Sequence, residues 1–138
     1  MSLEIALYAV AAMFGIIIMR QDVMTWKVGI IPLGCFFVAC GSIFYVERNG
    51  CIFLSVILIL AGSVMFLIRK AHAIGIADYI VGASISFIIP MSRIHVFFIS
   101  CGIIGLTAHI LLASKKIPFT PVMLTASTFT KFIEFIWD

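Results

Sequence analysis

The sequence predicts an all-α polytopic membrane protein with about six transmembrane helices and its N-terminus outside. Of its 138 residues, 64% are hydrophobic and only 11% are charged, and the mean hydropathy is +1.28. Soluble domains have about 45–50% apolar and about 25% charged residues, so a chain this poor in charge cannot cover a water-facing surface. The composition excludes a soluble globular domain, a disordered chain, a secreted disulfide scaffold and a coiled coil, and it indicates a protein embedded in lipid.

Charged residues divide the sequence into apolar runs of roughly the length that a bilayer requires. The runs are continuous rather than alternating in hydropathy, which favours helices over a barrel. We expect transmembrane helices within residues 5–19, 28–46, 49–68, 71–92, 94–114 and 117–130, of which the first and last are short. At about 20 residues per crossing, six helices use nearly the whole chain, so we expect a single domain.

The distribution of basic residues predicts the orientation, because cytoplasmic connections are enriched in Lys and Arg. Six basic residues follow the first, third and fifth helices, and three lie on the opposite side. The excess places the odd-numbered connections in the cytoplasm. The six are Arg20, Lys27, Arg69, Lys70, Lys115 and Lys116, and the three are Arg48, Arg93 and Lys131. The net charge of only +3 and the scattered basic residues do not indicate a nucleic-acid partner.

Two of the six acidic residues differ from the rest. Asp22 falls just past the first predicted helix, and Asp78 lies inside the fourth apolar run, so that both are at predicted cytoplasmic ends of helices. An ionisable residue at membrane depth costs about 2.5–3.5 kcal/mol, and its presence therefore indicates function. The other four are expected to be solvated by water at chain ends or in an external turn: Glu4, Glu47, Glu134 and Asp138.

A pair of carboxyl groups a few Å apart cannot easily be doubly ionised, so it shares one proton and titrates as a unit. This state suits peptide hydrolysis, because the ionised member takes a proton from water while the protonated member polarises the scissile carbonyl. A purely structural interpretation is also open. In that interpretation Asp22 is a solvated loop residue beside Arg20 or Lys27. Asp78 is then a helix cap or a partner for Lys70.

Three short motifs lie in order on the predicted cytoplasmic side. Asp22 ends an early helix, and Gly75-Ile76-Ala77-Asp78 precedes an apolar helix. Residues 116–124, KIPFTPVML, place Pro118 and Pro121 at the start of the last helix. Together these segments resemble the motifs of the type IV prepilin peptidases, which are GxGD-type membrane aspartic proteases, and the third is similar to their terminal I-P-F-x-P-x-x-L segment. The resemblance spans the whole chain.

The resemblance implies one membrane-embedded aspartic peptidase domain over residues 1–138, in the bacterial inner membrane and with its active site facing the cytoplasm. Asp22 and Asp78 would be catalytic, and no metal or other cofactor is implied. The implied substrate is a prepilin-like membrane protein of the Flp or pseudopilin type, from which a leader peptide is removed. The backbone near the second aspartate and the last helix would be shaped by Gly75, Ala77, Pro118 and Pro121.

The sequence departs from the family pattern at two points. Ala77 replaces the second glycine of the motif, and no Pro-Asn follows Asp22. If the family glycine needs a positive φ, alanine there adds strain of roughly 1–2 kcal/mol. There is also no room for the insertion with paired CxxC motifs that larger prepilin peptidases have, so we expect peptidase activity alone. Other candidates for contacting substrate or lining the site are Trp26, Lys27, His72 and Tyr79.

The alternative function belongs to another class. The chain would then be a non-catalytic membrane subunit, either a diverged relative that binds pilin-like helices or a small transport subunit that uses Asp78 in a proton path. A transporter is expected to place its acidic residue nearer the bilayer midplane, within repeated broken helices, and no repeat is visible. No metal site is expected, because the four cysteines form no CxxC pair and have no histidine at zinc-ligand spacing.

Overall fold

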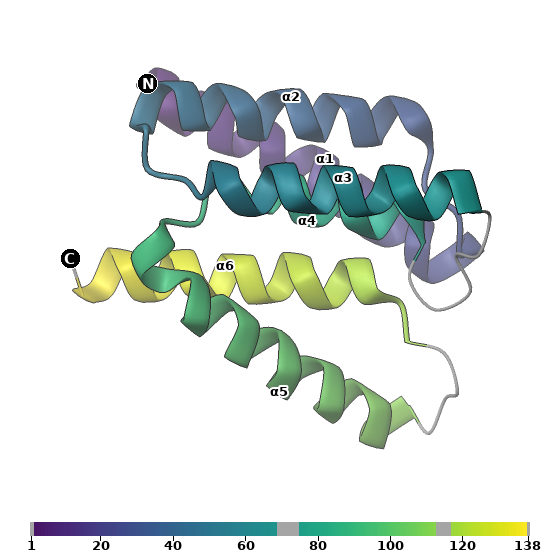
Figure 1. The fold of residues 1–138 in the computed structure, drawn as a ribbon. Coiled ribbons are helices and arrows are strands. Elements are labelled where there is room, and N and C mark those ends of the chain that lie inside the picture. Colours follow the sequence, from purple (N-terminus) through teal and green to yellow (C-terminus); the bar gives the residue numbers. More distant parts are fainter. Residues whose placement is uncertain (1, 69–74, 113–116, 138) are drawn as a thin grey trace.

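The computed structural model describes residues 2–68, 75–112 and 117–137, and all regular structure in these ranges is helical (Figure 1). The all-α prediction is confirmed for this part of the chain. In order, the elements are α1 (Leu3–Thr25), α2 (Ile30–Glu47), α3 (Ile52–Ile68), α4 (Ile76–Ser86), the 3-10 helix η1 (Met91–Arg93), α5 (Ile94–Leu112) and α6 (Phe119–Trp137).

Three segments are long and apolar enough to cross a membrane. They are α1, α2 and the segment Met91–Leu112, which joins η1 to α5, and their hydropathy lies between 1.8 and 2.0. The apolar helices α3 and α4 have 17 and 11 residues. The prediction of a membrane protein is therefore supported, whereas six crossings and an external N-terminus stay predictions.

The fourth apolar run differs from the single long helix expected over residues 71–92. Within its described residues, α4 ends at Ser86 after 11 residues, which is about 16 Å at 1.5 Å per residue. The chain then tightens into turns, in which the Phe87 N–H donates to the Ser84 carbonyl at 3.1 Å. Pro90 follows, and a proline disfavours helical backbone at the residue before it. The helix therefore stops well short of the bilayer thickness of about 30 Å.

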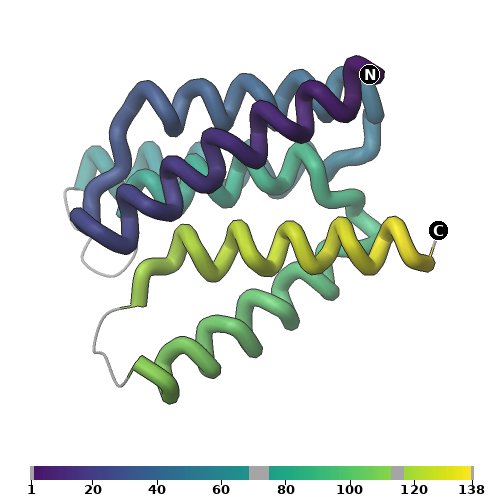
Figure 2. The backbone as a smooth tube through the Cα atoms, turned by 180° about the vertical axis from the view of Figure 1, so that it is seen from behind, coloured from purple at the N-terminus to yellow at the C-terminus, as the bar shows by residue number. Residues whose placement is uncertain are grey.

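Helix α4 lies in the middle of the bundle. Its last six residues, from Val81 to Ser86, are all buried, and it contacts α2, α3 and α6. Sequence neighbours pair as α1 with α2, α3 with α4, and α5 with α6, and α1 also contacts α6. Figure 2 shows the face on which α1 and α6 run, whereas α5 diverges from the other helices towards its C-terminal end (Figure 1).

The connection between α2 and α3 determines where α4 can end. The Cys51 N–H donates to the Ser86 carbonyl at 2.8 Å, which joins this connection to the last residue of α4. A Cβ atom on Gly50 would overlap the carbonyl oxygen of Phe87. Only glycine therefore fits at position 50 while the two segments keep this contact.

Replacement of Gly50 should reveal how much stability depends on this contact. Gly50→Ala is expected to lower the free energy of unfolding by about 1–3 kcal/mol, because overpacking forces the backbone to shift. The control is Gly41→Ala in α2, where an added Cβ meets nothing within 4 Å. That change should be neutral or stabilising by up to about 1 kcal/mol, since alanine favours a helix. Thermal unfolding in detergent, followed by circular dichroism, compares them, and a Gly50→Ala variant as stable as the control would contradict the interpretation.

Candidate active site

Asp22 lies in the last turn of α1. The sequence placed it just past the helix, but α1 continues to Thr25 and ends at Trp26, which has a left-handed backbone with φ 55°. The Trp26 N–H donates to the Asp22 carbonyl at 3.0 Å, and the Thr25 hydroxyl donates to the Gln21 carbonyl at 2.8 Å. These local bonds extend the helix through the polar residues that follow the apolar run, so the Asp22 side chain has a fixed origin on α1.

Gln21 joins the end of α1 to the start of α2. Its Oε1 atom accepts a hydrogen bond at 2.9 Å from the N–H of Gly29, the residue that precedes α2. The N–H groups at a helix start have no partner within the helix, so this bond satisfies a group that would otherwise lack one. This bond links the last turn of α1, which carries Asp22, to the start of α2.

Asp78 occupies the third position of α4 and accepts two hydrogen bonds. Its Oδ2 atom accepts from the N–H of Gly75 at 3.0 Å, and its Oδ1 atom accepts from the hydroxyl group of Thr120 at 2.8 Å. The first bond is a helix cap, since a carboxylate in the first turn satisfies a free N–H and lies at the positive end of the helix dipole. The second bond joins α4 to α6, 42 residues along the chain.

Thr120 connects the two aspartates. It is fully buried in the first turn of α6, between Pro118 and Pro121. The carboxyl group of Asp22 lies near the hydroxyl group and the backbone N–H of Thr120, and near enough to Asp78 to be affected by its charge. The last turn of α1 and the first turns of α4 and α6 thus bring both carboxyl groups to one threonine.

One carboxyl oxygen of the two aspartates lacks a hydrogen-bond partner among the described residues. The Oδ2 atom of Asp22 is buried and has no hydrogen-bond partner among the described residues. A buried polar atom without a partner costs about 1–3 kcal/mol, so such atoms are concentrated where a proton or a bound molecule is handled. The arrangement offers one carboxyl group held by two donors and a second with a free oxygen beside it.

The backbone near Asp78 is unstrained. Gly75 is extended, with φ −73°, and Ala77 lies in the first turn of α4. Among described residues other than glycine, a positive φ occurs only at Trp26 and Arg48. The strain that alanine would suffer in a left-handed conformation therefore does not arise at position 77.

The other candidate residues are not brought to the aspartates by any described contact. Trp26 and Lys27 are exposed in the α1–α2 connection, where the Lys27 N–H donates to the Thr25 hydroxyl at 3.3 Å. Tyr79 packs against α3, since a Cβ atom on Gly62 would lie 2.9 Å from its own Cβ. His72 lies outside the described residues. The described residues also contain no group of three or more His, Cys, Asp or Glu side chains that could hold a metal ion.

Glu47 and Glu134 are ion-paired rather than merely solvated, which corrects the expectation from the sequence. Lys131 Nζ lies 3.6 Å from Glu47 Oε2 and 3.0 Å from Glu134 Oε2, and it is 5.7 Å from the centre of the Tyr8 ring. The spacing of Lys131 and Glu134, three residues apart on one helix, was a visible signal for one pair. Glu47 is distant in sequence, and nothing in the pattern pointed to it.

Thr120 is expected to stabilise the fold as well as the site. Thr120→Val keeps the shape but removes the donor to Asp78, leaving a buried carboxyl oxygen unpaired, so the free energy of unfolding should fall by about 1–3 kcal/mol. Thr120→Ser should restore most of the loss. The control is Thr125→Val, one turn later, where the exposed hydroxyl donates only to the Pro121 carbonyl of its own helix. Thermal unfolding in detergent measures both, and equal shifts for positions 120 and 125 would disprove a special role of Thr120.

Comparisons with known proteins add no relative whose chemistry could be transferred to this site. No family model, curated protein or solved structure matches the chain. The functional argument therefore depends on the geometry of the two aspartates and on the motifs of this sequence.

Proposed function

We propose that the protein is a membrane aspartic endopeptidase that removes the leader peptide of type IV prepilin-like precursors at the cytoplasmic face of the bacterial inner membrane. The observation that supports this most is the meeting of Asp22 and Asp78 at Thr120, from three helices that are far apart in sequence. Structural carboxylates in apolar helices are rare because of their cost, and two at one place are better explained by chemistry. The order of the three motifs indicates the substrate class.

The hydrogen bonds suggest which aspartate holds the shared proton. A threonine hydroxyl has one proton, and Thr120 gives it to Asp78. Asp22 has one buried carboxyl oxygen without a hydrogen-bond partner among the described residues and lies beside the charge of Asp78, so it is suited to the protonated form. Asp78, which accepts from Gly75 and Thr120, is suited to the ionised form. We therefore assign Asp78 as the base and Asp22 as the acid.

In the proposed reaction, Asp78 takes a proton from a water molecule whose oxygen bonds to the scissile carbonyl carbon. Asp22 gives its proton to the carbonyl oxygen, which forms a neutral tetrahedral diol. The proton on Asp78 then passes to the leaving nitrogen as the C–N bond breaks, and Asp22 recovers a proton from a diol hydroxyl. The products are a carboxylic acid and an amine, and both aspartates return to their initial states.

The proposed topology has six crossings with the N-terminus outside. The final turns of α1, α3 and α5 and the first turns of α2, α4 and α6 lie at one end of the bundle (Figure 1), which is the end of the aspartates. The excess of Lys and Arg assigns this end to the cytoplasm. The fourth crossing would consist of α4 and the turn that follows it. Irregular backbone is tolerated at membrane depth when protein surrounds it, and Ile89 and Pro90 in this turn are buried.

One observation favours the alternative, a non-catalytic membrane subunit that binds pilin-like helices or takes part in transport. Asp78 caps α4 through Gly75, so its carboxylate has a structural role that needs no reaction. The cap does not explain Asp22, however, which has a buried oxygen and no partner for it among the described residues. A peptidase function explains why both carboxyl groups are present, whereas a non-catalytic subunit explains only the one that caps α4.

Substitution of each aspartate by asparagine tests the peptidase. Asparagine keeps the size and an oxygen acceptor, so the cap on α4 should survive, but it can neither take nor give the required proton. Each of Asp22→Asn and Asp78→Asn should lower cleavage of a co-expressed precursor by about 10²–10⁴-fold. The precursor should have a short basic leader that ends in a small residue and is followed by an apolar helix. Cleavage is measured from the new N-terminus by mass spectrometry.

The matched control for this experiment is Glu4→Gln, an exposed acidic residue in the first turn of α1. It should cleave like the unaltered protein. Full cleavage by either asparagine variant would exclude the two-aspartate mechanism. If the folded, unaltered protein cleaves no such precursor, the non-catalytic function is favoured instead.

A further inference from the structure

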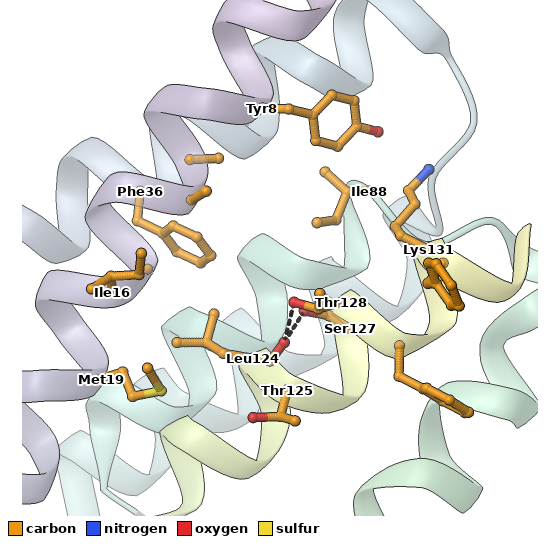
Figure 3. A pocket seen from close by; sticks show the side chains of 15 residues that line it. Tyr8, Ile16, Met19, Phe36, Ile88, Leu124, Thr125, Ser127, Thr128 and Lys131 are labelled. Carbon is orange, nitrogen blue, oxygen red and sulfur yellow. Dashed lines mark hydrogen bonds between the residues drawn. The ribbon is translucent and has the colours of Figure 1, made fainter. Parts of the chain in front are cut away.

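An apolar groove runs along the protein between α1 and α6 (Figure 3). Its volume is about 760 Å³, within the range of about 300–1,000 Å³ that is typical of pockets for small ligands. One wall is formed by Ala12, Ile16 and other residues of α1, and the opposite wall by the middle of α6. Phe36 of α2 and Ile88, after α4, also line it.

The groove begins next to the aspartates. Met19 lines it and precedes Asp22 by three residues on α1, and Leu124 lines it and follows Thr120 by four residues on α6. Both separations are about one helical turn. From Met19 the lining continues along α1 to Tyr8, a distance of about 16 Å at 1.5 Å per residue. One end of the groove therefore lies about one helical turn from the carboxyl pair, although neither aspartate lines it.

The walls present hydrocarbon although α6 has several hydroxyl groups there. The hydroxyls of Ser127 and Thr128 both donate to the Leu124 carbonyl, at 2.8 and 2.9 Å (Figure 3). Thr125 donates to the Pro121 carbonyl in the same way. Because these protons are used within α6, the groove offers methyl groups and ring edges to an occupant. Its phenol and ammonium groups, those of Tyr8 and Lys131, lie together at one end.

The α1 wall is lowest at Ala12, which is small and exposed, whereas its small neighbours Ala11 and Gly15 are buried. Small residues allow the backbone of a second helix to approach closely in lipid. α1 is also one of the membrane-spanning candidates, so the groove lies at membrane depth. A peptide at that depth must satisfy its own backbone groups and is therefore helical. The wall of about 16 Å corresponds to three turns of such a helix.

We infer that the groove binds the apolar helix of the membrane-spanning substrate, with the bond to be cleaved at the Asp22–Asp78 end and the following turns along α1 and α6. This inference rests on the proposed function, since it is the closeness of one end of the groove to the carboxyl pair that selects a peptide as the occupant. The helix after the cleaved bond would be recognised by its apolar character and by its fit against Ala12, not by hydrogen bonds.

Filling the groove should impair substrate binding without altering the carboxyl groups. Ala12 is exposed and lines the groove, so Ala12→Trp places a large ring in it. The matched control is Met13→Trp, at the next residue of α1, which is 51% exposed and does not line the groove. In liposomes with increasing amounts of precursor, Ala12→Trp should raise KM at least about tenfold and leave kcat nearly unchanged. Met13→Trp should leave both within about twofold.

Photo-cross-linking gives a second measurement that needs no activity and no altered groove. A precursor with a diazirine amino acid two or three turns after the cleaved bond is irradiated with the Asp78→Asn protein in liposomes, and the attachment sites are mapped by mass spectrometry. Attachment should be concentrated at Ala12, Ile16 and Thr128. The outer face of α5, at Ile103 and Leu106, serves as the lipid-exposed reference.

The outcomes separate the inference from the function. In one outcome the unaltered protein cleaves the precursor, the two tryptophan variants have equal KM, and attachment is spread over lipid-exposed residues. This outcome would overturn the inference and assign the groove to lipid tails. The proposed peptidase function would be unaffected. Attachment in the groove without cleavage would support the inference and overturn the peptidase in favour of a binding subunit. Neither cleavage nor attachment in the groove would overturn both.

Discussion

The hydrogen bond from Thr120 to Asp78 is the interaction on which the arrangement at the end of the bundle depends. Among the described residues, this side-chain hydrogen bond joins α4 to α6. The same threonine also lies near Asp22 of α1. Thr120 is fully buried, and a hydrogen bond in such surroundings is stronger than one in water, while a missing partner costs more. Pro121, which follows Thr120 in the first turn of α6, lacks an N–H, so this turn has one donor fewer that needs a partner.

The short length of α4 is the second constraint. A helix of 11 residues cannot cross a bilayer, but α4 is covered by α2, α3 and α6 and needs no lipid-facing surface along its second half. The buried serines there are tolerated because their hydroxyl groups are hydrogen-bonded: Ser84 and Ser86 donate to carbonyls of their own helix at 2.7 and 2.8 Å. The helix begins at the level of the carboxyl groups and presents its N-terminus, the positive end of its dipole, to Asp78. A short central helix therefore places a charged site at the end of an otherwise apolar bundle.

The sequence predicted the helical class and singled out Asp22 and Asp78, because both fall at predicted cytoplasmic ends of apolar helices. It did not predict Thr120, since a threonine in a helix of a membrane protein resembles Thr125 and Thr128, which merely bond to their own backbone. The end of α1 was also misplaced, because its cap is Trp26 rather than the glycine that marks most such ends. The stop of α4 depends on contacts with Gly50 and Cys51, and long-range contacts of this kind leave no periodic signal.

Helix α6 is held near both of its ends by polar contacts, and this has a mechanical consequence. Thr120 binds Asp78 in the first turn, and Lys131 pairs with Glu47 of α2 in the second half. Between these two contacts α6 forms one wall of the apolar groove. The position of this wall therefore depends on a contact near each end of the helix. If one of these two contacts is lost, the other still attaches α6. The contacts of Thr120 and Lys131 lie at opposite ends of the groove, so the carboxyl pair and the far end of the groove are attached to the same helix.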